Sequence, residues 1–147
     1  MVWIVIAAVI ILDQLSKYMV ANGTIPEMVI IRNFFHITYV KNTGMAWSLL
    51  SGQTGLLALI SAAAIGYMLY YLLKNRPDKI TSFALALMIG GAAGNLIDRL
   101  FLSYVRDFLN FYIFGYDFPV FNIADAALCI GVFLLLVASF LEERKNG

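Results

Sequence analysis

The sequence predicts an all-α membrane protein with four transmembrane helices and a small, cradle-like β-sheet on the extracytoplasmic surface. Three observations lead to this prediction. The chain has 147 residues, of which 62% are hydrophobic and only 13% charged, against about 45–50% and about 25% in soluble domains. Four apolar stretches are long enough to cross a bilayer core of about 30 Å as helices. Between the first two lies a segment rich in β-branched and aromatic residues.

The four predicted spans occupy approximately residues 3–20, 54–73, 80–98 and 122–141. The first is expected to be a retained helix, because the basic residues that begin a cleaved signal peptide are missing before it. The polar turn at 74–79 is short, so the second and third spans are expected to be antiparallel neighbours. We expect residues 1–147 to form a single integral membrane domain.

Two connecting segments are expected at the membrane surface. The stretch of about 28–50 is rich in Val, Ile, Phe and Tyr and breaks at Asn42-Thr43-Gly44, which predicts a small sheet followed by a turn. Gly44 is expected to adopt a left-handed conformation in that turn. The segment 101–121 is also aromatic, and we expect it to be a loop in the interfacial belt.

Polar residues gather near those ends of the spans that share one side of the membrane. Span one ends, span three ends and span four begins on that side, so connectivity places Asp13, Asn95, Asp98 and Asp125 at similar depth. Asp107 comes from the connector that shares this surface. Charged groups held in a membrane are costly and are functional candidates by default. The sequence therefore predicts one composite site.

The basic residues predict the orientation of the chain. The side of the termini carries Lys74, Arg76, Lys79, Arg144 and Lys145. The side of the predicted site also carries five, but Lys17, Arg99 and Arg106 are expected to bind partners within the site, which leaves Arg32 and Lys41. Because cytoplasmic segments carry the excess of Lys and Arg, we expect cytoplasmic termini and an extracytoplasmic site.

The first polar motif, Asp13-x-x-x-Lys17, has a structural and a functional interpretation. An acid four residues before a base is the favourable order for an ion pair on a helix. In the structural interpretation this pair only stabilises the helix, and Lys17 extends its ammonium group to the interface. The alternative is a role for both residues in facing the substrate.

The third span ends in a run of small residues followed by polar ones. Gly90, Gly91 and Gly94 have the spacing that lets helix backbones approach closely. Asn95, Asp98 and Arg99 then lie on one face of the same helix. Because Asp98 and Arg99 are adjacent, they are expected to bond outward to other elements, which favours a supporting network over direct chemistry.

The fourth span begins with Asn122-Ile123-Ala124-Asp125. Asn is a good N-cap, and an acidic residue three positions later suits the first turn of a helix, so capping alone would explain both residues. A second interpretation comes from the preceding connector, which brings Asp107 to the same surface. We therefore expect Asp107 and Asp125 to form a catalytic pair.

Composition and motifs exclude several classes of function. A net charge of +1 leaves no basic footprint for nucleic acid. The single cysteine, Cys129, cannot form an internal disulfide, and with the single histidine, His36, it makes no zinc site. We expect Cys129 to be buried in its apolar run. The sequence lacks a serine nucleophile constellation, a phosphate-binding loop and a zinc-protease motif, so no metal or cofactor is expected.

Five motifs occur in order along nearly the whole chain. They are Asp13-x-x-Ser16-Lys17, Asn42-Thr43-Gly44-Met45-Ala46-Trp47, Gly90-Gly91-Ala92-Ala93-Gly94-Asn95-Leu96-Ile97-Asp98-Arg99, Val105-Arg106-Asp107-Phe108 and Phe121-Asn122-Ile123-Ala124-Asp125. Each motif alone is weak, whereas the ordered set is specific. Together they resemble the motifs of bacterial lipoprotein signal peptidase, the type II signal peptidase.

This resemblance implies a multi-pass aspartyl endopeptidase of the bacterial inner (cytoplasmic) membrane. Such enzymes remove the signal peptide from a diacylglyceryl-modified prolipoprotein, cutting just before the lipobox cysteine, and are the target of globomycin. Carried over by motif, the catalytic residues are Asp107 and Asp125. The positions that shape the site and hold the substrate are Asp13, Lys17, Asn42, Gly44, Asn95, Asp98, Arg99 and Asn122.

Two carboxyls held together supply both an acid and a base, because like charges at close range keep one of them protonated. Asp125 at a helix N-terminus is the expected base, and Asp107 the expected acid. The expected partners are the prolipoprotein and membrane lipids, with the chain acting as a monomer. The alternative is a small ion- or proton-coupled membrane carrier, which would need ionisable groups near the midplane or on both faces.

Overall fold

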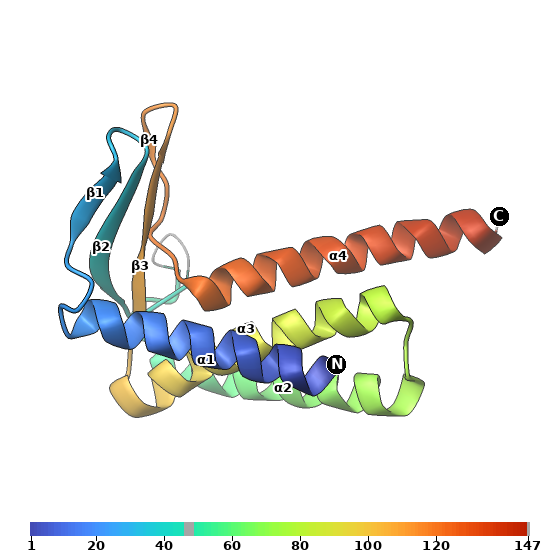
Figure 1. The fold of residues 1–147 in the computed structure, drawn as a ribbon. Helices are drawn as coiled ribbons and strands as arrows, with labels where there is room; N and C mark the ends of the chain where they lie inside the picture. Colours follow the sequence, from blue (N-terminus) through green and yellow to red (C-terminus); the bar gives the residue numbers. More distant parts are fainter. Residues whose placement is uncertain (46–48, 147) are drawn as a thin grey trace.

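A computed structural model describes residues 1–45 and 49–146, and in this part of the chain it contains four long helices and a four-stranded antiparallel sheet (Figure 1). Each helix is long and apolar enough to cross a membrane. The predicted fold class is confirmed. The helices are α1 (Val2–Ala21), α2 (Thr54–Asn75), α3 (Lys79–Leu102) and α4 (Ile123–Asn146).

The third and fourth helices are longer than the predicted spans. Helix α3 continues through Leu102, beyond the expected end at Asp98-Arg99, and α4 continues through Asn146. Charged residues do not end these helices because charged side chains are well tolerated where a helix leaves the hydrocarbon region. Asp98 and Arg99 therefore lie inside a helix and have fixed directions on its surface.

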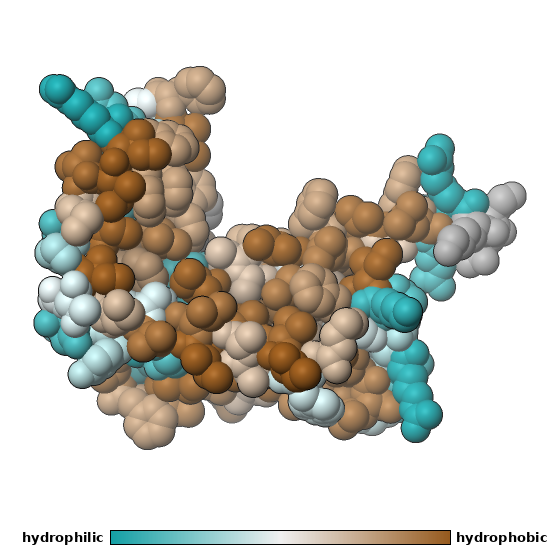
Figure 2. All heavy atoms as spheres, in the orientation of Figure 1, coloured by the Kyte–Doolittle hydropathy of each residue, from teal (hydrophilic) through white to brown (hydrophobic). Residues whose placement is uncertain are grey.

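Helix α3 is the centre of the bundle and packs against each of the other three helices. Half of the most apolar stretch of α3 is buried, whereas most residues in the corresponding stretches of the other helices are at least partly exposed, as suits contact with lipid (Figure 2). Cys129 on α4 is among the exposed residues, so its expected burial is wrong. The core that holds α3 in place consists of Ile6, Met68, Leu72, Leu85, Ala86, Ile89 and Ala92.

The glycines of α3 allow the neighbouring helices to come close, as predicted. A Cβ added to Gly91 would lie 2.4 Å from the carbonyl oxygen of Ala124, and one added to Gly94 would lie 2.5 Å from Oδ2 of Asp13. Both distances are too short for a real carbon atom. The small residues thus allow α1 and the first turn of α4 to lie directly against α3.

The sheet has the strand order β1 (Met28–Ile31), β2 (Phe35–Asn42), β3 (Val105–Ile113) and β4 (Tyr116–Asp117), with antiparallel neighbours throughout. The sheet predicted within 28–50 is present as β1 and β2. The connector 101–121 is not the expected loop, since it supplies β3 and β4. The polar residues of β3 interrupt the alternation of apolar and polar residues that predicts a strand, so the sequence did not indicate one here.

The sheet stands at one end of the bundle, across the direction of the helices (Figure 1). Both termini and the turn between α2 and α3 lie at the other end. Strand β3 is anchored at the sheet end by two buried apolar side chains, Val105 and Phe108. The spans that were expected to meet at one surface, with the sheet beside them, do so.

Candidate active site

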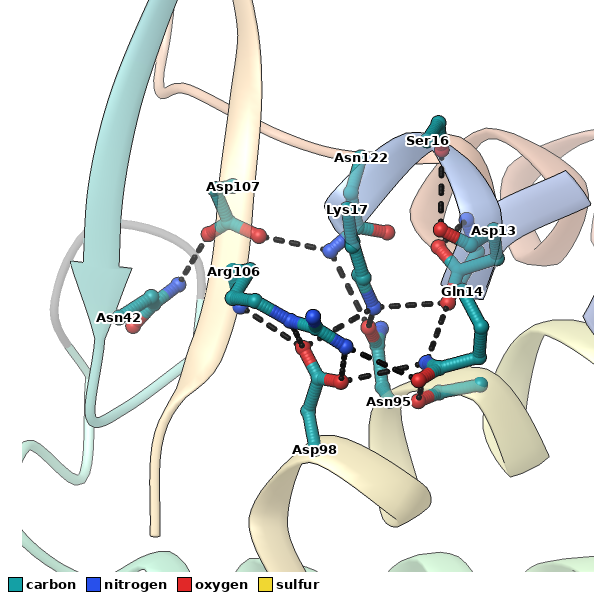
Figure 3. A network of polar contacts seen from close by, with 12 residues as sticks. Asp13, Gln14, Ser16, Lys17, Asn42, Asn95, Asp98, Arg106, Asp107 and Asn122 are labelled. Carbon is teal, nitrogen blue, oxygen red and sulfur yellow. Dashed lines mark hydrogen bonds and ion pairs between the residues drawn. The ribbon is translucent and has the colours of Figure 1, made fainter. Parts of the chain in front are cut away.

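A network of polar side chains connects α1, α3, β2, β3 and the start of α4 where the sheet meets the bundle (Figure 3). Five of its members are the largest side chains in the described part of the chain that are fully buried: Asp13, Lys17, Asp98, Asp107 and Asn122. Buried polar groups are tolerated only when they bond to one another. The network therefore accounts for most of the polar residues singled out in the sequence.

Lys17 is held inside the network by α1 and α3. Its Nζ lies 2.8 Å from Oδ2 of Asp13 and 3.5 Å from Oδ2 of Asp98, and it donates a hydrogen bond of 2.9 Å to Oδ1 of Asn95. The predicted ion pair with Asp13 is confirmed. The expected extension of Lys17 to the interface is wrong, because the buried carboxylates outcompete water for its charge.

Two asparagines link the candidate aspartates to each other. Asn95 donates from Nδ2 to Oδ1 of Asp125 at 2.8 Å. Asn122 donates from Nδ2 to Oδ1 of Asp107 at 2.6 Å and to Oδ1 of Asn95 at 3.1 Å. Asp107 and Asp125 therefore belong to one continuous chain of side-chain hydrogen bonds that runs from β3 to α4.

The start of α4 is capped by side chains, as the structural interpretation of Asn122 and Asp125 predicted. The backbone N–H of Asp125 donates to Oδ1 of Asn122 at 2.9 Å, and that of Asn122 donates to Oδ2 of Asp125 at 3.1 Å. A third amide, that of Ala124, donates to Oδ1 of Asp13 at 3.0 Å. Capping occupies Oδ2 of Asp125 and leaves Oδ1 directed to Asn95.

Asp107 has amide partners. It is 2% exposed, and its carboxylate accepts hydrogen bonds from Nδ2 of Asn42 at 2.9 Å and from Asn122. Burial and the negative charge of Asp125 raise the pKa of Asp107 from 3.8 to about 7, although the two amide bonds oppose the change. Asp107 can therefore hold a proton near neutral pH.

Asp98 supports the site through residues on other elements, as expected. Its carboxylate accepts from the backbone N–H of Arg106 at 2.9 Å and from the guanidinium Nη2 at 2.7 Å. Gln14 donates to the same carboxylate at 3.2 Å. The charge of Asp98 is thus shared by Arg106 and Lys17.

Gln14 was not identified from the sequence as a site residue. Its Nε2 donates to Oδ2 of Asp13, to the carbonyl of Gly94 and to Asp98, and its Oε1 accepts from Arg106. The signal available was an amide side chain within an apolar helix, where such groups commonly bond across helices. An amide in an apolar helix does not indicate which residues it bonds, so the partners of Gln14 could be identified only from the fold.

Arg99 reaches away from Asp98 toward the turn after β2. Its Nη2 donates to the carbonyl oxygen of Gly44 at 3.2 Å, and its buried Nε has no protein partner among the described residues. The charges of Asp125 and Asp107 are the two that attract it most strongly. Arg99 is therefore a cation beside both candidate aspartates, and its Nε is a hydrogen-bond donor without a partner among the described residues.

Gly44 differs from its predicted conformation. In the described chain the glycines with positive φ are Gly23, Gly52 and Gly115, so Gly44 is not left-handed. A Cβ at Gly44 would instead lie 2.6 Å from the carbonyl oxygen of Leu49, and this close approach is what requires glycine. Ala46 and Trp47, the rest of this expected motif, lie outside the described residues.

Among the residues the structure describes, no group of three or more His, Cys, Asp or Glu side chains is arranged to hold a metal ion. The carboxylates of Asp13 and Asp98 are bonded to cations of the chain itself.

Comparison with known proteins shows the family of this chain. A family model described as Signal peptidase (SPase) II matches residues 5–141. The chain belongs to the signal peptidase II family. A lipoprotein signal peptidase of Bacillus pumilus (strain SAFR-032) is 42% identical over 147 residues, which cover 98% of this chain and 95% of the relative. Membership in the signal peptidase II family makes the chain a multi-pass membrane protease.

Two solved structures have the same fold as this signal peptidase II family member. One is a bacterial membrane enzyme determined by the in meso method at 2.3 Å resolution, with a TM-score of 0.89 and 36% identity, covering 99% of this chain and 90% of that one. The other, determined in the same way at 1.9 Å, has a TM-score of 0.84 and 36% identity over 93% and 90% of the two chains.

Proposed function

We propose that the chain is an aspartic endopeptidase that removes signal peptides from diacylglyceryl-modified prolipoproteins, with Asp107 and Asp125 as the catalytic dyad. The observation that carries this proposal is the pair itself. The two carboxyls share a chain of amide hydrogen bonds, and burial together with the charge of Asp125 raises the pKa of Asp107 to about 7. A peptidase that uses neither a metal ion nor a covalent nucleophile needs such a pair, with one proton between the two carboxyls.

In the proposed reaction each carboxyl has one task. We assign Asp125 as the base, because it lies at the N-terminus of α4, where the helix dipole stabilises a negative charge. It takes a proton from water as the oxygen attacks the peptide carbonyl. Asp107 supplies its proton to the departing amine when the C–N bond breaks. The two carboxyls titrate as a unit, so this division of roles describes the favoured microstate.

Two features support the binding of an extended peptide beside the dyad. Strand β2 has β3 on one side and β1 on the other. On the β1 side only Phe35, His36 and Ile37 are paired, and in the described chain no strand pairs with the rest of that edge, Thr38–Asn42. An extended substrate can add to such an edge through main-chain hydrogen bonds. The unpartnered Nε of Arg99 supplies a further donor next to the dyad.

The backbone amides of the turn after β2 bond within the chain. The backbone N–H of Gly44 donates to Oδ1 of Asn42, and that of Met45 donates to the carbonyl of Leu49, so neither amide is free for a peptide. The first of these bonds orients Asn42 toward Asp107. Asn42 and Gly44 therefore serve the site by holding the Asp107 carboxyl in place.

The membrane arrangement completes the proposal. We place the termini and the turn at 74–79 in the cytoplasm of a bacterial cell and the sheet at the extracytoplasmic surface of its inner membrane. The scissile bond before the lipobox cysteine would then lie at the end of a hydrophobic signal segment, level with the dyad. The exposed apolar faces of the helices would hold the diacylglyceryl chains, each buried CH₂ contributing about 0.8 kcal/mol. The chain acts as a single-domain monomer.

One incubation tests the proposal. Purified protein is mixed with a diacylglyceryl-modified prolipoprotein, and the loss of the signal peptide is followed by gel shift and mass spectrometry. We expect cleavage immediately before the modified cysteine, none of an unmodified prolipoprotein, and no effect of a chelator. Cleavage at another bond, or inactivation by a chelator that added metal reverses, would disprove the assignment.

A further inference from the structure

Arg106 is a cation of the network that lies directly before Asp107 on strand β3. Its backbone N–H donates to Oδ2 of Asp98 at 2.9 Å, and its Nε and Nη2 donate to the same carboxylate at 3.2 Å and 2.7 Å. Nη2 also donates to Oε1 of Gln14 at 2.9 Å. Helices α3 and α1 therefore hold both the main chain and the side chain of this one strand residue.

This attachment determines where Asp107 lies. Successive residues of a strand point to opposite faces, so Arg106 can bind the helices while Asp107 points to the other side. The amide of Arg106 and the carboxyl of Asp107 are separated by a few rotatable bonds. A shift of the strand at Arg106 would lengthen the bonds that Asn42 and Asn122 make to Asp107.

Arg106 is also linked to Asp125, through Asp98, Lys17 and Asn95. Asp98 lies 3.5 Å from Nζ of Lys17, and Lys17 in turn donates to Asn95, whose Nδ2 bonds to Asp125. Arg106 and Lys17 both neutralise Asp98. Without the Arg106 guanidinium, Lys17 would be drawn toward Asp98 and away from Asn95.

We propose that Arg106, held by Asp98 and Gln14, is a positioning residue that orients both aspartates of the dyad without touching the substrate. This inference rests on the proposed function. Arg106 suits the role because a guanidinium offers a rigid fork of donors, which a lysine cannot reproduce.

The charges around Arg106 predict how its removal changes the pH dependence. The positive charge of Lys17 favours the ionised form of the dyad. If Lys17 moves toward Asp98, both apparent pKa values of the dyad rise, and the pH–rate profile moves to higher pH. The ionisable groups around Arg106 and the dyad include Asp13, Lys17, Tyr39, Lys41, Asp98, Arg99, Tyr104, Asp107 and Asp125.

The test compares three variants of the full chain in cleavage of a diacylglyceryl-modified prolipoprotein across pH. Arg106→Gln removes the charge and the fork, whereas Arg106→Lys keeps the charge alone. The matched control is Arg32→Gln, because Arg32 is an exposed arginine in the turn between β1 and β2 and belongs neither to the polar network nor to the proposed peptide-binding edge of β2. Asp107→Asn is assayed beside them as the test of the dyad itself.

We expect kcat of Arg106→Gln to fall about 30-fold with KM within about twofold, since small misplacements of catalytic groups cost up to about 100-fold. Its pH–rate profile should move up by about half a pH unit. Arg106→Lys should lose about fivefold in kcat with the pH–rate profile in place, and Arg32→Gln should match the wild type.

Two results would overturn the inference. One is a kcat of Arg106→Lys within twofold of wild type, and this variant decides the matter if Arg106→Gln does not fold. The other is a rise in KM at constant kcat, which would make Arg106 a substrate contact. Either result, with Asp107→Asn inactive, leaves the proposed function standing. An active Asp107→Asn would instead remove the dyad and this inference together.

Discussion

Asn122 and Asp125 cap each other: each backbone N–H donates to the side chain of the other residue, at 3.1 Å and 2.9 Å. This reciprocal cap fixes the first turn of α4 and directs the remaining polar atoms of both side chains into the network. Asn122 thereby reaches Asp107, and Asp125 reaches Asn95. Helix capping and a role in the site are therefore compatible interpretations of Asn122 and Asp125, because the same side chains serve both.

Asp107→Asn and Asp125→Asn should each abolish cleavage while leaving the fold intact. An amide keeps the shape of the carboxyl and can still cap α4, but it cannot exchange a proton with water or an amine. We expect kcat to fall at least about 1,000-fold. The measurement is single-turnover cleavage, with thermal unfolding in detergent as the check on folding. Turnover near the wild-type level in either variant would show that the dyad is misassigned.

Asp98→Ala should damage stability as well as activity. The substitution leaves Arg106 and Lys17 without a carboxylate they share, and breaking a buried pair costs about 3–5 kcal/mol. Asp78→Ala at the other end of α3 is the control. Its exposed carboxylate only caps the helix at Ile80 and Thr81, and losing a cap costs about 1 kcal/mol. Unfolding of both variants is measured in detergent. A fully stable Asp98→Ala that has lost turnover would instead place Asp98 against the substrate.

Turnover and stability should both decline as pH rises toward neutrality. The pKa of Asp107 is about 7 in the folded protein, raised by burial and by Asp125 from 3.8. The folded state thus binds this proton more tightly than the unfolded state, so stability falls as pH rises between about 4 and about 7. Turnover falls through the upper end of that range because the acid form is lost. Unfolding and rate profiles across pH measure the two effects.

Asp125→Asn should lower the pKa of Asp107, since it removes the second of the two causes that raise it. The titration of the Asp107 carboxyl can be followed by its infrared band, with Asp107→Asn to identify the band. An unchanged pKa of Asp107 in the Asp125→Asn variant would show that the two carboxyls are not coupled.

Gly94→Ala should destabilise the protein, whereas Gly66→Ala should not. The new Cβ at position 94 would meet Oδ2 of Asp13, which Lys17 and Gln14 hold in place, and such overpacking costs about 1–3 kcal/mol. Gly66 in α2 has open space where its Cβ would lie, so alanine there only favours the helix. The measurement is thermal unfolding of both variants. Equal stability of the two would contradict the prediction and mean that α1 can move away from α3.

The sequence by itself determined the membrane class, the four spans and the end of the bundle at which the polar residues meet. These follow from long apolar runs and from connectivity, because a chain that crosses the membrane must alternate sides. Local patterns also sufficed for the Asp13–Lys17 pair and for the cap at Asn122, since both partners lie within one helical turn.

Only the tertiary structure decided which residues bond across elements. The strand β3 was concealed because Arg106 and Asp107 interrupt its apolar alternation, and their partners come from α3, β2 and the start of α4. Gln14 lies 92 positions from Arg106 along the chain, so no periodicity relates the two residues. Hydrogen bonds of this kind depend on the relative placement of whole helices and strands, which packing sets and which local sequence does not encode.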